Sequence, residues 1–273
     1  MKIAVLQMTS GIDPAANAAT LTDAIAAAKA GGAAMLFTPE MSGLLDRDRE
    51  RASANLFAEA DDPVLASVCA AAAEQRIWVQ IGSLAVRDGD RLANRSFVID
   101  DGGAIRARYD KLHLFDVDLP TGESWRESAA YRAGDGAAVV ATPVGQLGLS
   151  ICYDLRFPDL YRALSDAGAE ILSVPAAFTR PTGAAHWQVL LRARAIEAAC
   201  FVVAAAQTGE HQDGRATYGH SLVIDPWGEV LLDMGEDAGL GFAELDPARL
   251  SDVRARVPAL RHRRPIPPVA VIA

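Results

Sequence analysis

The stretch Gly145–Leu160 reads GQLGLSICYDLRFPDL and combines a short buried strand, a turn and the start of a helix. Leu147–Ile151 is mostly apolar and of strand length, and Pro158 suits the first turn of a helix. Cys152 lies in the turn between them. A thiol at such a turn sits on a sharply bent backbone, beside N–H groups that the new helix leaves free, which suits a nucleophile. The same pattern also fits a buried cysteine that packs as a small hydrophobic side chain.

Apolar strands and Ala-rich helices alternate along the rest of the chain. Asp13-Pro14 opens a helix that Gly31-Gly32 ends, and Asp62-Pro63 opens another that runs to about Gln75. We predict strands at 3–8, 35–38, 77–86, 91–100, 105–114, 147–151, 171–174, 201–205, 221–224, 230–233 and 241–245, and further helices near 158–167, 186–199 and from 247. The alternation predicts an α/β class with buried sheets, in a single domain over residues 1–273.

Composition and charge exclude several classes of function. The chain has 273 residues, of which 51% are hydrophobic, and a formal net charge of −9. This charge argues against non-specific binding to nucleic acid or to an anionic membrane. Its three cysteines are an odd number without metal-ligand spacing, so we expect neither a disulfide framework nor a metal site. The chain has no long apolar run and no signal-peptide pattern, and a cytoplasmic location is expected.

Lysine is scarce in this sequence. Of the 26 basic residues only Lys2, Lys29 and Lys111 are lysines. Lys2 and Lys29 lie at a terminus and near an expected helix end, where a solvated charge is sufficient explanation. Lys111 lies elsewhere, and an ammonium differs from a guanidinium because it is a compact point charge.

Three chemically useful residues stand at or near the ends of predicted strands. Glu40 ends the run after 35–38, Lys111 lies near the end of 105–114, and Cys152 follows 147–151. Sites in α/β proteins gather outside the carboxyl ends of strands, so the three side chains can converge. A cysteine nucleophile needs a base for its proton and a cation where negative charge develops. Taken singly, each also fits an ordinary role, as a capping carboxylate, a surface cation and a core cysteine.

Three segments resemble the signature motifs of the nitrilase superfamily of carbon–nitrogen hydrolases. They read LFTPEMS, YDKLHLFD and GLSICYDLRFP. The later stretches AGAEILSVPAAFTRPTGAAHWQVLLRARAIEAACFVVAAAQTG, YGHSLVIDPWG and HRRP are most similar to the Nit branch of that superfamily. Tyr153-Asp154 follows the cysteine where true nitrilases typically carry Trp-Glu, and this difference favours amides over nitriles as substrates.

The resemblance implies both a fold and a mechanism. The family fold is an αββα two-sheet sandwich that pairs into αββααββα dimers, so a homodimer or higher homo-oligomer is expected. Cys152 would be the nucleophile, Glu40 the general base and then acid, and Lys111 the stabiliser of tetrahedral intermediates together with a backbone N–H just after the cysteine. Glu127, in WRES, matches the additional active-site glutamate of the family. No metal or organic cofactor is implied.

Further residues are candidates for substrate binding. Residues 121–136 read as a long loop, a frequent form of functional lid, and this loop contains Glu123 and Glu127. His113 fits a hydrogen-bonded structural histidine better than a catalytic one, and Arg180 follows a strand at a place where it could meet a carboxylate. The candidates for the pocket wall are Tyr153, Arg156, Phe178, Thr179, His186 and Trp187. Core packing or surface solvation would equally explain most of them.

The expected activity is hydrolysis of a small anionic amide through a cysteine thioester, with release of ammonia. Deaminated glutathione is the first candidate substrate and 2-oxoglutaramate the second. A catalytically inactive binding module on the same scaffold is the alternative of another class. A nucleotide-binding oxidoreductase does not fit, because no G-x-G-x-x-G follows the first strand.

Overall fold

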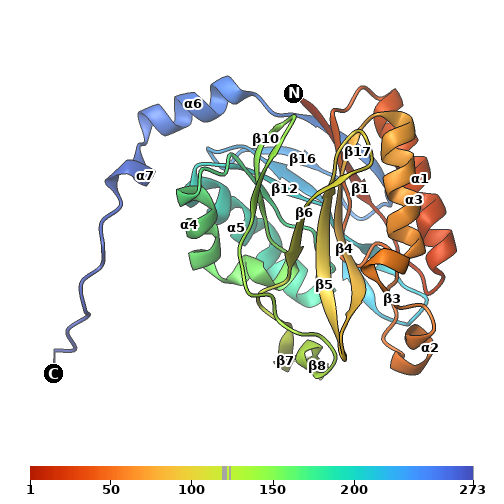
Figure 1. The fold of residues 1–273 in the computed structure, drawn as a ribbon. Helices are drawn as coiled ribbons and strands as arrows, with labels where there is room; N and C mark the ends of the chain where they lie inside the picture. Colours follow the sequence, from red (N-terminus) through yellow and green to blue (C-terminus); the bar gives the residue numbers. More distant parts are fainter. Residues whose placement is uncertain (119–121, 123, 273) are drawn as a thin grey trace.

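Two β-sheets pack face to face between two layers of helices, as Figure 1 shows. The computed structural model of the protein describes residues 1–118, 122 and 124–272. Thr121 and Glu123, which belong to the expected lid loop, lie outside these residues. The αββα layering expected from the resemblance is therefore present in the fold.

The first sheet has the strand order β17-β1-β2-β4-β5-β6, and β3 pairs with β4. Strands β1, β2 and β4 run parallel, whereas β17, β5 and β6 are antiparallel to their neighbours. Their bounds are β1 Lys2–Gln7, β2 Met35–Phe37, β3 Phe57–Ala58, β4 Trp78–Asp88, β5 Arg91–Ile99, β6 Ile105–Asp110 and β17 Gly239–Glu244.

Strand β1 shows how this sheet is buried on both faces. Side chains alternate across a strand. Ile3 and Val5 therefore join the cluster between the two sheets, while Ala4 and Leu6 pack under helices. The helices are α1 (Pro14–Ala30) and α3 (Pro63–Gln75), each capped by the aspartate and opened by the proline that the sequence predicts.

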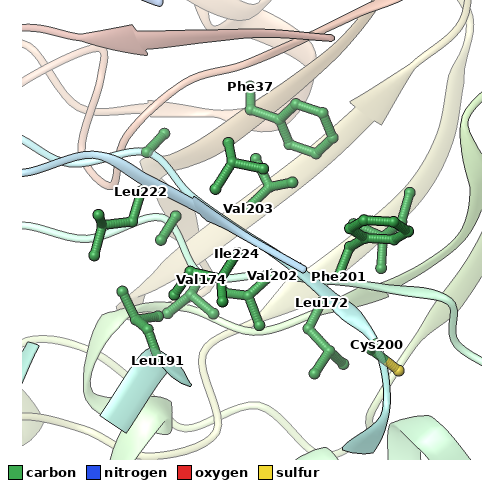
Figure 2. Close-up of a cluster of buried hydrophobic side chains, with 14 of the residues drawn as sticks. Phe37, Leu172, Val174, Leu191, Cys200, Phe201, Val202, Val203, Leu222 and Ile224 are labelled. Atoms are coloured by element: carbon green, nitrogen blue, oxygen red, sulfur yellow. The ribbon is translucent and has the colours of Figure 1, made fainter. Parts of the chain in front are cut away.

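The second sheet has the strand order β16-β15-β12-β11-β10-β9 and lies against α4 and α5. Its buried side chains form the cluster that Figure 2 shows, including Phe201, Val203 and Ile224 and, from β2 of the first sheet, Phe37. The bounds are β9 Val139–Thr142, β10 Gly145–Leu149, β11 Ile171–Ser173, β12 Phe201–Ala204, β15 Leu222–Ile224, β16 Val230–Asp233, α4 Pro158–Asp166 and α5 Arg180–Ala198.

Short elements complete the fold. Strands β7 and β8 form a small hairpin that lies near α2 at the lower end of the molecule in Figure 1, and the C-terminal segment extends away from the body. No helix in the described part of the chain has the length and apolar character needed to span a membrane. The bounds are α2 Arg49–Ser53, η1 Glu59–Asp61, β7 Asp116–Asp118, β8 Ser124–Arg126, η2 Glu127–Ala129, η3 Cys152–Arg156, β13 Thr208–Glu210, β14 Ala216–Tyr218, α6 Pro247–Arg256 and α7 Ala259–His262.

Three predicted boundaries were wrong in informative ways. Helix α5 begins at Arg180 and not at His186, because Pro181 already suits its first turn. Strand β6 ends at Asp110, so Lys111 follows the strand. The described part of 121–136 is not a plain loop, since it holds β8 and the turn η2.

Candidate active site

A pocket of about 920 Å³ opens among the loops that follow β2, β6, β10 and β11. The hairpins β7–β8 and β13–β14 supply further parts of its wall. Glu40, Lys111, Glu127 and Cys152 all line this pocket. The convergence expected at the strand ends is therefore present. Glu40 and Lys111 follow strands of the first sheet and Cys152 follows a strand of the second, and the ends of these strands open on the same pocket.

Cys152 stands on a strained turn after β10. Its φ is +50°, a left-handed conformation that is uncommon for a residue with a side chain. Its backbone N–H donates to Pro175 O at 2.9 Å, which ties the turn to the segment after β11. The residue is only 8% exposed. The backbone thus fixes the thiol at the base of the pocket.

A buried carboxylate below Cys152 holds this turn in place. Asp154 accepts hydrogen bonds from Ile151 N at 2.8 Å, Tyr109 Oη at 2.7 Å and His113 N at 3.0 Å. The ring of His113 also lies 2.7 Å from Asp154 through Nδ1 and stacks on Phe157 at 3.6 Å between ring centroids. His113 therefore has the structural role that the sequence favours.

Glu40 is held against β4 by a backbone contact that only glycine permits. A Cβ at Gly82 would lie 2.1 Å from Thr38 O, so a larger residue would displace the segment that carries Glu40. Gly82 N also donates to Thr38 Oγ1 at 3.1 Å, and Met41 N donates to Ser83 Oγ at 3.0 Å. The irregular pairing of β4 at this point creates the space.

Four side chains form a closed ring of hydrogen bonds at the base of the pocket. Lys111 Nζ donates to Glu40 Oε1 and to Glu127 Oε2, each at 2.9 Å. Asn94 Nδ2 donates to the same Glu40 Oε1 at 2.9 Å and to Glu127 Oε1 at 3.1 Å. The ring fixes both carboxylates relative to the single ammonium group.

The protonation states follow from this ring. Burial would raise the pKa of Glu40, but Lys111, Cys152 and Asn94 outweigh it and hold the pKa below its ordinary value. Burial would lower the pKa of Lys111, but Glu127 and Glu40 raise it well above its ordinary value. Burial and the adjacent charge of Glu40 raise the pKa of the Cys152 thiol well above its usual value. The resting site therefore contains a carboxylate, an ammonium and a neutral thiol.

Sequence reasoning missed Asn94. It is fully buried on β5, and its Oδ1 has no hydrogen-bond partner among the described residues. The available signal was a polar residue in a strand otherwise predicted to be buried, because burying an amide is costly unless it is hydrogen-bonded. Its two donated bonds show which groups compensate that cost.

Next to Cys152, one backbone N–H is left without a backbone acceptor. Tyr153 N has no backbone acceptor among the described residues, whereas Cys152 N and Asp154 N are both paired. Ala177 N donates to Glu40 Oε2 at 3.0 Å and so fixes the other carboxylate oxygen. Tyr153 N and Lys111 Nζ are thus the donors available to an oxyanion in the pocket.

The predicted substrate-binding residues divide into two groups. Tyr153, Arg156, Phe178 and Thr179 line the pocket. His186, Trp187 and Arg180 are not among the described residues that line it. Trp187 is 1% exposed and packs in the core, because its indole N–H donates to His220 O at 2.7 Å from inside α5. His186 contacts Arg156 from outside the pocket.

Arg156 is the cation nearest in sequence to Cys152. It forms no ion pair with any described carboxylate and lies over the rings of Phe178 and Tyr153, at 5.6 and 5.9 Å from the ring centroids. Its guanidinium contacts His186 Nδ1 at 3.3 Å. An arginine without an acidic partner in a pocket wall can bind a carboxylate.

Among the described residues, no three His, Cys, Asp or Glu side chains gather as a metal site would require.

Comparison with known proteins places this site in context. The family model described as carbon–nitrogen hydrolase matches residues 2–255. A protein of Synechocystis sp. named deaminated glutathione amidase is 44% identical over 95% of this chain and 97% of its own length. Relatives from bacteria and mammals at 39–41% identity carry the same name.

Two solved structures are similar over nearly the whole chain. The NitFhit protein of C. elegans has a TM-score of 0.89 and 40% identity, and covers 96% of this chain, which in turn spans 65% of that protein. A variant of the amidase from Nesterenkonia sp. AN1 has a TM-score of 0.80 and 30% identity, covering 94% of this chain and 98% of its own. That structure shows the result of Michael addition of acrylamide at its active-site cysteine.

Proposed function

Because the chain belongs to the carbon–nitrogen hydrolase family, we propose that it is an amidase whose thiol, Cys152, attacks the amide carbon of a small anionic substrate. The observation that carries this proposal is the meeting of Glu40, Lys111 and Cys152 in one pocket. An inactive binding module would not need a carboxylate and an ammonium set against a thiol on a strained turn. Loss of hydrolysis on removal of the thiol separates the two alternatives.

The first half of the proposed reaction forms a thioester. Glu40 accepts the proton of the Cys152 thiol, and the sulfur attacks the amide carbon. The carbonyl oxygen becomes negative and receives hydrogen bonds from Lys111 Nζ and Tyr153 N. The C–N bond then breaks, and the amine leaves with the proton that Glu40 returns. The lowered pKa of Glu40 ensures that the base is ionised when the substrate arrives.

The second half releases the acid. Glu40 removes a proton from water, the hydroxide attacks the thioester carbon, and the C–S bond breaks as Glu40 returns the proton to the sulfur and restores the neutral thiol. We propose that Glu127 keeps Lys111 in position, since it accepts from Nζ at 2.9 Å and is itself fixed by Phe115 N at 2.7 Å. These steps require neither a metal nor an organic cofactor.

Deaminated glutathione is the substrate that we propose first. The relatives named for that activity support it, and Arg156 is available for the carboxylate of the 2-oxo acid half. This substrate carries an oxo group in place of the amino group of glutathione, so its γ-amide joins 2-oxoglutarate to cysteinylglycine. Cleavage of that amide yields cysteinylglycine, and the release of ammonia expected from the sequence applies instead to a primary amide such as 2-oxoglutaramate.

We expect kcat/KM for deaminated glutathione to exceed that for 2-oxoglutaramate by at least about tenfold, equivalent to about 1.4 kcal/mol of transition-state binding. The pocket of about 920 Å³ is at the large end for small-molecule sites, and the smaller amide leaves much of it unfilled. Both reactions give 2-oxoglutarate, so one coupled assay of that product measures both rates. A tenfold preference for 2-oxoglutaramate would contradict this order and favour the omega-amidase alternative.

The pH dependence of kcat/KM follows from the protonation states of the free site. Activity needs an ionised Glu40 and a protonated Lys111. The pKa of Glu40 lies below its ordinary value of 4.5, so activity falls only as the pH drops through that lowered pKa. The pKa of Lys111 lies above its ordinary value of 10.5, so activity persists throughout the neutral range and is lost only in strong alkali. Initial rates from acid to alkali test this, and a midpoint near neutrality would contradict it.

We also propose that the protein acts in the cytoplasm as one catalytic domain and pairs as a homodimer. Exposed apolar side chains on α5 support pairing, since Val189 is 68% and Ile196 is 53% exposed. Sedimentation equilibrium of the purified protein measures the oligomeric state, and a monomer at micromolar concentration would contradict it.

A further inference from the structure

A row of three aromatic rings crosses the pocket, with an arginine at each end. Arg156 lies 5.9 Å from the ring of Tyr153, whose centroid is 5.2 Å from that of Phe115. Phe115 is 6.3 Å from Trp125, and the guanidinium of Arg215 lies over Trp125 at 5.2 Å. All five residues line the same pocket. This row therefore has two cationic ends separated by an apolar middle. Other arginines also line the pocket outside the row, namely Arg47, Arg49, Arg87, Arg91 and Arg126.

The reacting groups lie beside the middle of this row. Tyr153 directly follows Cys152, and Phe115 N donates to Glu127 Oε2 at 2.7 Å. A substrate whose amide reaches Cys152 thus has one half directed toward Arg156 and the other toward Arg215. Arg156 is already assigned to the acid half in the proposed function, so within this row of residues the end at Arg215 is left for the amine half.

Arg215 is positioned on β13–β14 by a buried aspartate. Its Nε and Nη2 lie 2.7 and 2.6 Å from Asp213 Oδ2, and the side chain of Asp213 is 0% exposed. The Arg215 side chain is 20% exposed, and its Nη1 has no acceptor among the described residues. A guanidinium fixed along one edge presents its remaining N–H groups in a defined direction.

Tyr131 supplies a second polar group at this end. It lines the pocket, and its hydroxyl forms no hydrogen bond with the described side chains or backbone. Burial and the carboxylate of Glu127 raise the pKa of Tyr131, while the charge of Arg215 opposes them, so the phenol stays protonated within the electrostatic influence of both groups. Its protonated hydroxyl can donate to an oxygen of the amine half.

We propose that Arg215, Trp125 and Tyr131 form a leaving-group subsite that binds a carboxylate on the amine half of the substrate. The inference rests on the proposed function and deepens it, because it defines the substrate class as an amide with a carboxylate on both sides of the scissile bond. Ammonia has no carboxylate, so as a leaving group it makes no contact with this subsite. A peptide amine with a free C-terminus has one that the subsite can bind. Selectivity between the two substrates then depends on Arg215.

Arg215→Gln tests the subsite with the two substrates as internal references. We expect kcat/KM for deaminated glutathione to fall about 10- to 100-fold, the range for losing a hydrogen-bonded charge pair. For 2-oxoglutaramate, which has no second carboxylate, we expect a change of less than about threefold. The two measurements share one enzyme preparation, so a general loss of folded protein would lower both rates equally.

A neutral form of the substrate completes the test. Deaminated glutathione with its C-terminal carboxylate converted to an amide should react with the unmodified protein as slowly as the natural substrate reacts with Arg215→Gln. Combining the variant with this amide should cost nothing further, because both changes remove the same interaction. Additive losses would show that the C-terminal carboxylate of the substrate binds elsewhere and would contradict the proposed subsite.

Arg249→Gln is the matched control. Arg249 Nε lies 2.7 Å from Asp225 Oδ2, and the Asp225 side chain is 2% exposed, yet Arg249 does not line the pocket. This variant removes the same charge and leaves a buried aspartate without its cation, while Asp225 Oδ1 still accepts from Trp227 N and Glu229 N, and we expect unchanged selectivity. If the unmodified protein hydrolyses neither substrate, the proposed function is wrong and the subsite with it. If it hydrolyses both and Arg215→Gln changes both equally or neither, the proposed function stands and the subsite is wrong.

Discussion

Lys111→Arg is expected to lower kcat by at least about 100- to 1,000-fold, although it keeps the positive charge. Lys111 is 2% exposed, and its Nζ lies 2.9 Å from each of two carboxylates. An oxyanion donor must sit about 2.7–3.1 Å from the developing charge. The wider guanidinium cannot occupy the position of Nζ between Glu40 and Glu127 and still leave room for a substrate oxygen beside Cys152.

The burial of Lys111 adds a stability cost that its sequence context did not indicate. A larger side chain forced into a packed site destabilises by about 1–3 kcal/mol, so Tm of Lys111→Arg should fall as well. Circular dichroism separates this cost from catalysis, since kcat is measured well below the unfolding transition. Lys29→Arg is the matched control, because Lys29 is exposed and only donates to Arg76 O at 2.8 Å. Near-normal turnover of Lys111→Arg would show that the mechanism does not depend on the ammonium group of Lys111.

The site residues that sequence could identify are those at the ends of strands. Glu40 and Cys152 follow apolar runs and Lys111 lies near the end of a predicted strand, and the ends of these strands in the two sheets open on one pocket. The signature segments then assigned their roles. The starts of α1 and α3 were equally accessible, since Asp13-Pro14 and Asp62-Pro63 combine a capping side chain with a proline at the first helical turn.

Residues whose role depends on long-range approach could not be predicted. Asn94 lies inside β5, and only the packing of Lys111 and Glu127 around it shows why its amide is buried. Gly82 looks like any strand residue until the carbonyl of Thr38 is found against it. Arg215 is one of many arginines in the sequence, and its distinction comes from Asp213 and Trp125.

Of the two roles that the sequence left open for Trp187, the pocket wall and the core, its burial in the structure fits the core. We placed the start of its helix at His186, which would leave Trp187 in the first turn beside the pocket loop. The helix begins at Arg180, so Trp187 lies two turns inside it and faces the core against Phe178, at 4.7 Å between ring centroids. A difference of six residues in the start of α5 therefore decides whether Trp187 lies beside the pocket loop or in the core.

Cys152→Ala is expected to abolish turnover, a loss of at least about 10,000-fold, with the fold retained. The change removes one sulfur atom from a nearly buried site, so its cost in stability is on the order of 1 kcal/mol. Alanine keeps the Cβ that already occupies the left-handed backbone at φ +50°. Cys200→Ala is the matched control, because Cys200 is 0% exposed in the core and should affect stability without affecting turnover.

The central claim is that the acyl half of the substrate is transferred to the sulfur of Cys152. Rapid mixing with deaminated glutathione, acid quenching and mass spectrometry of the intact and digested protein test it directly. We predict a mass increase equal to the 2-oxoglutaryl group, carried by the peptide that contains Cys152, in the unmodified protein and in Cys200→Ala. Cys152→Ala should carry none and form no product. An acyl group on any other side chain, or continued turnover by Cys152→Ala, would contradict the account.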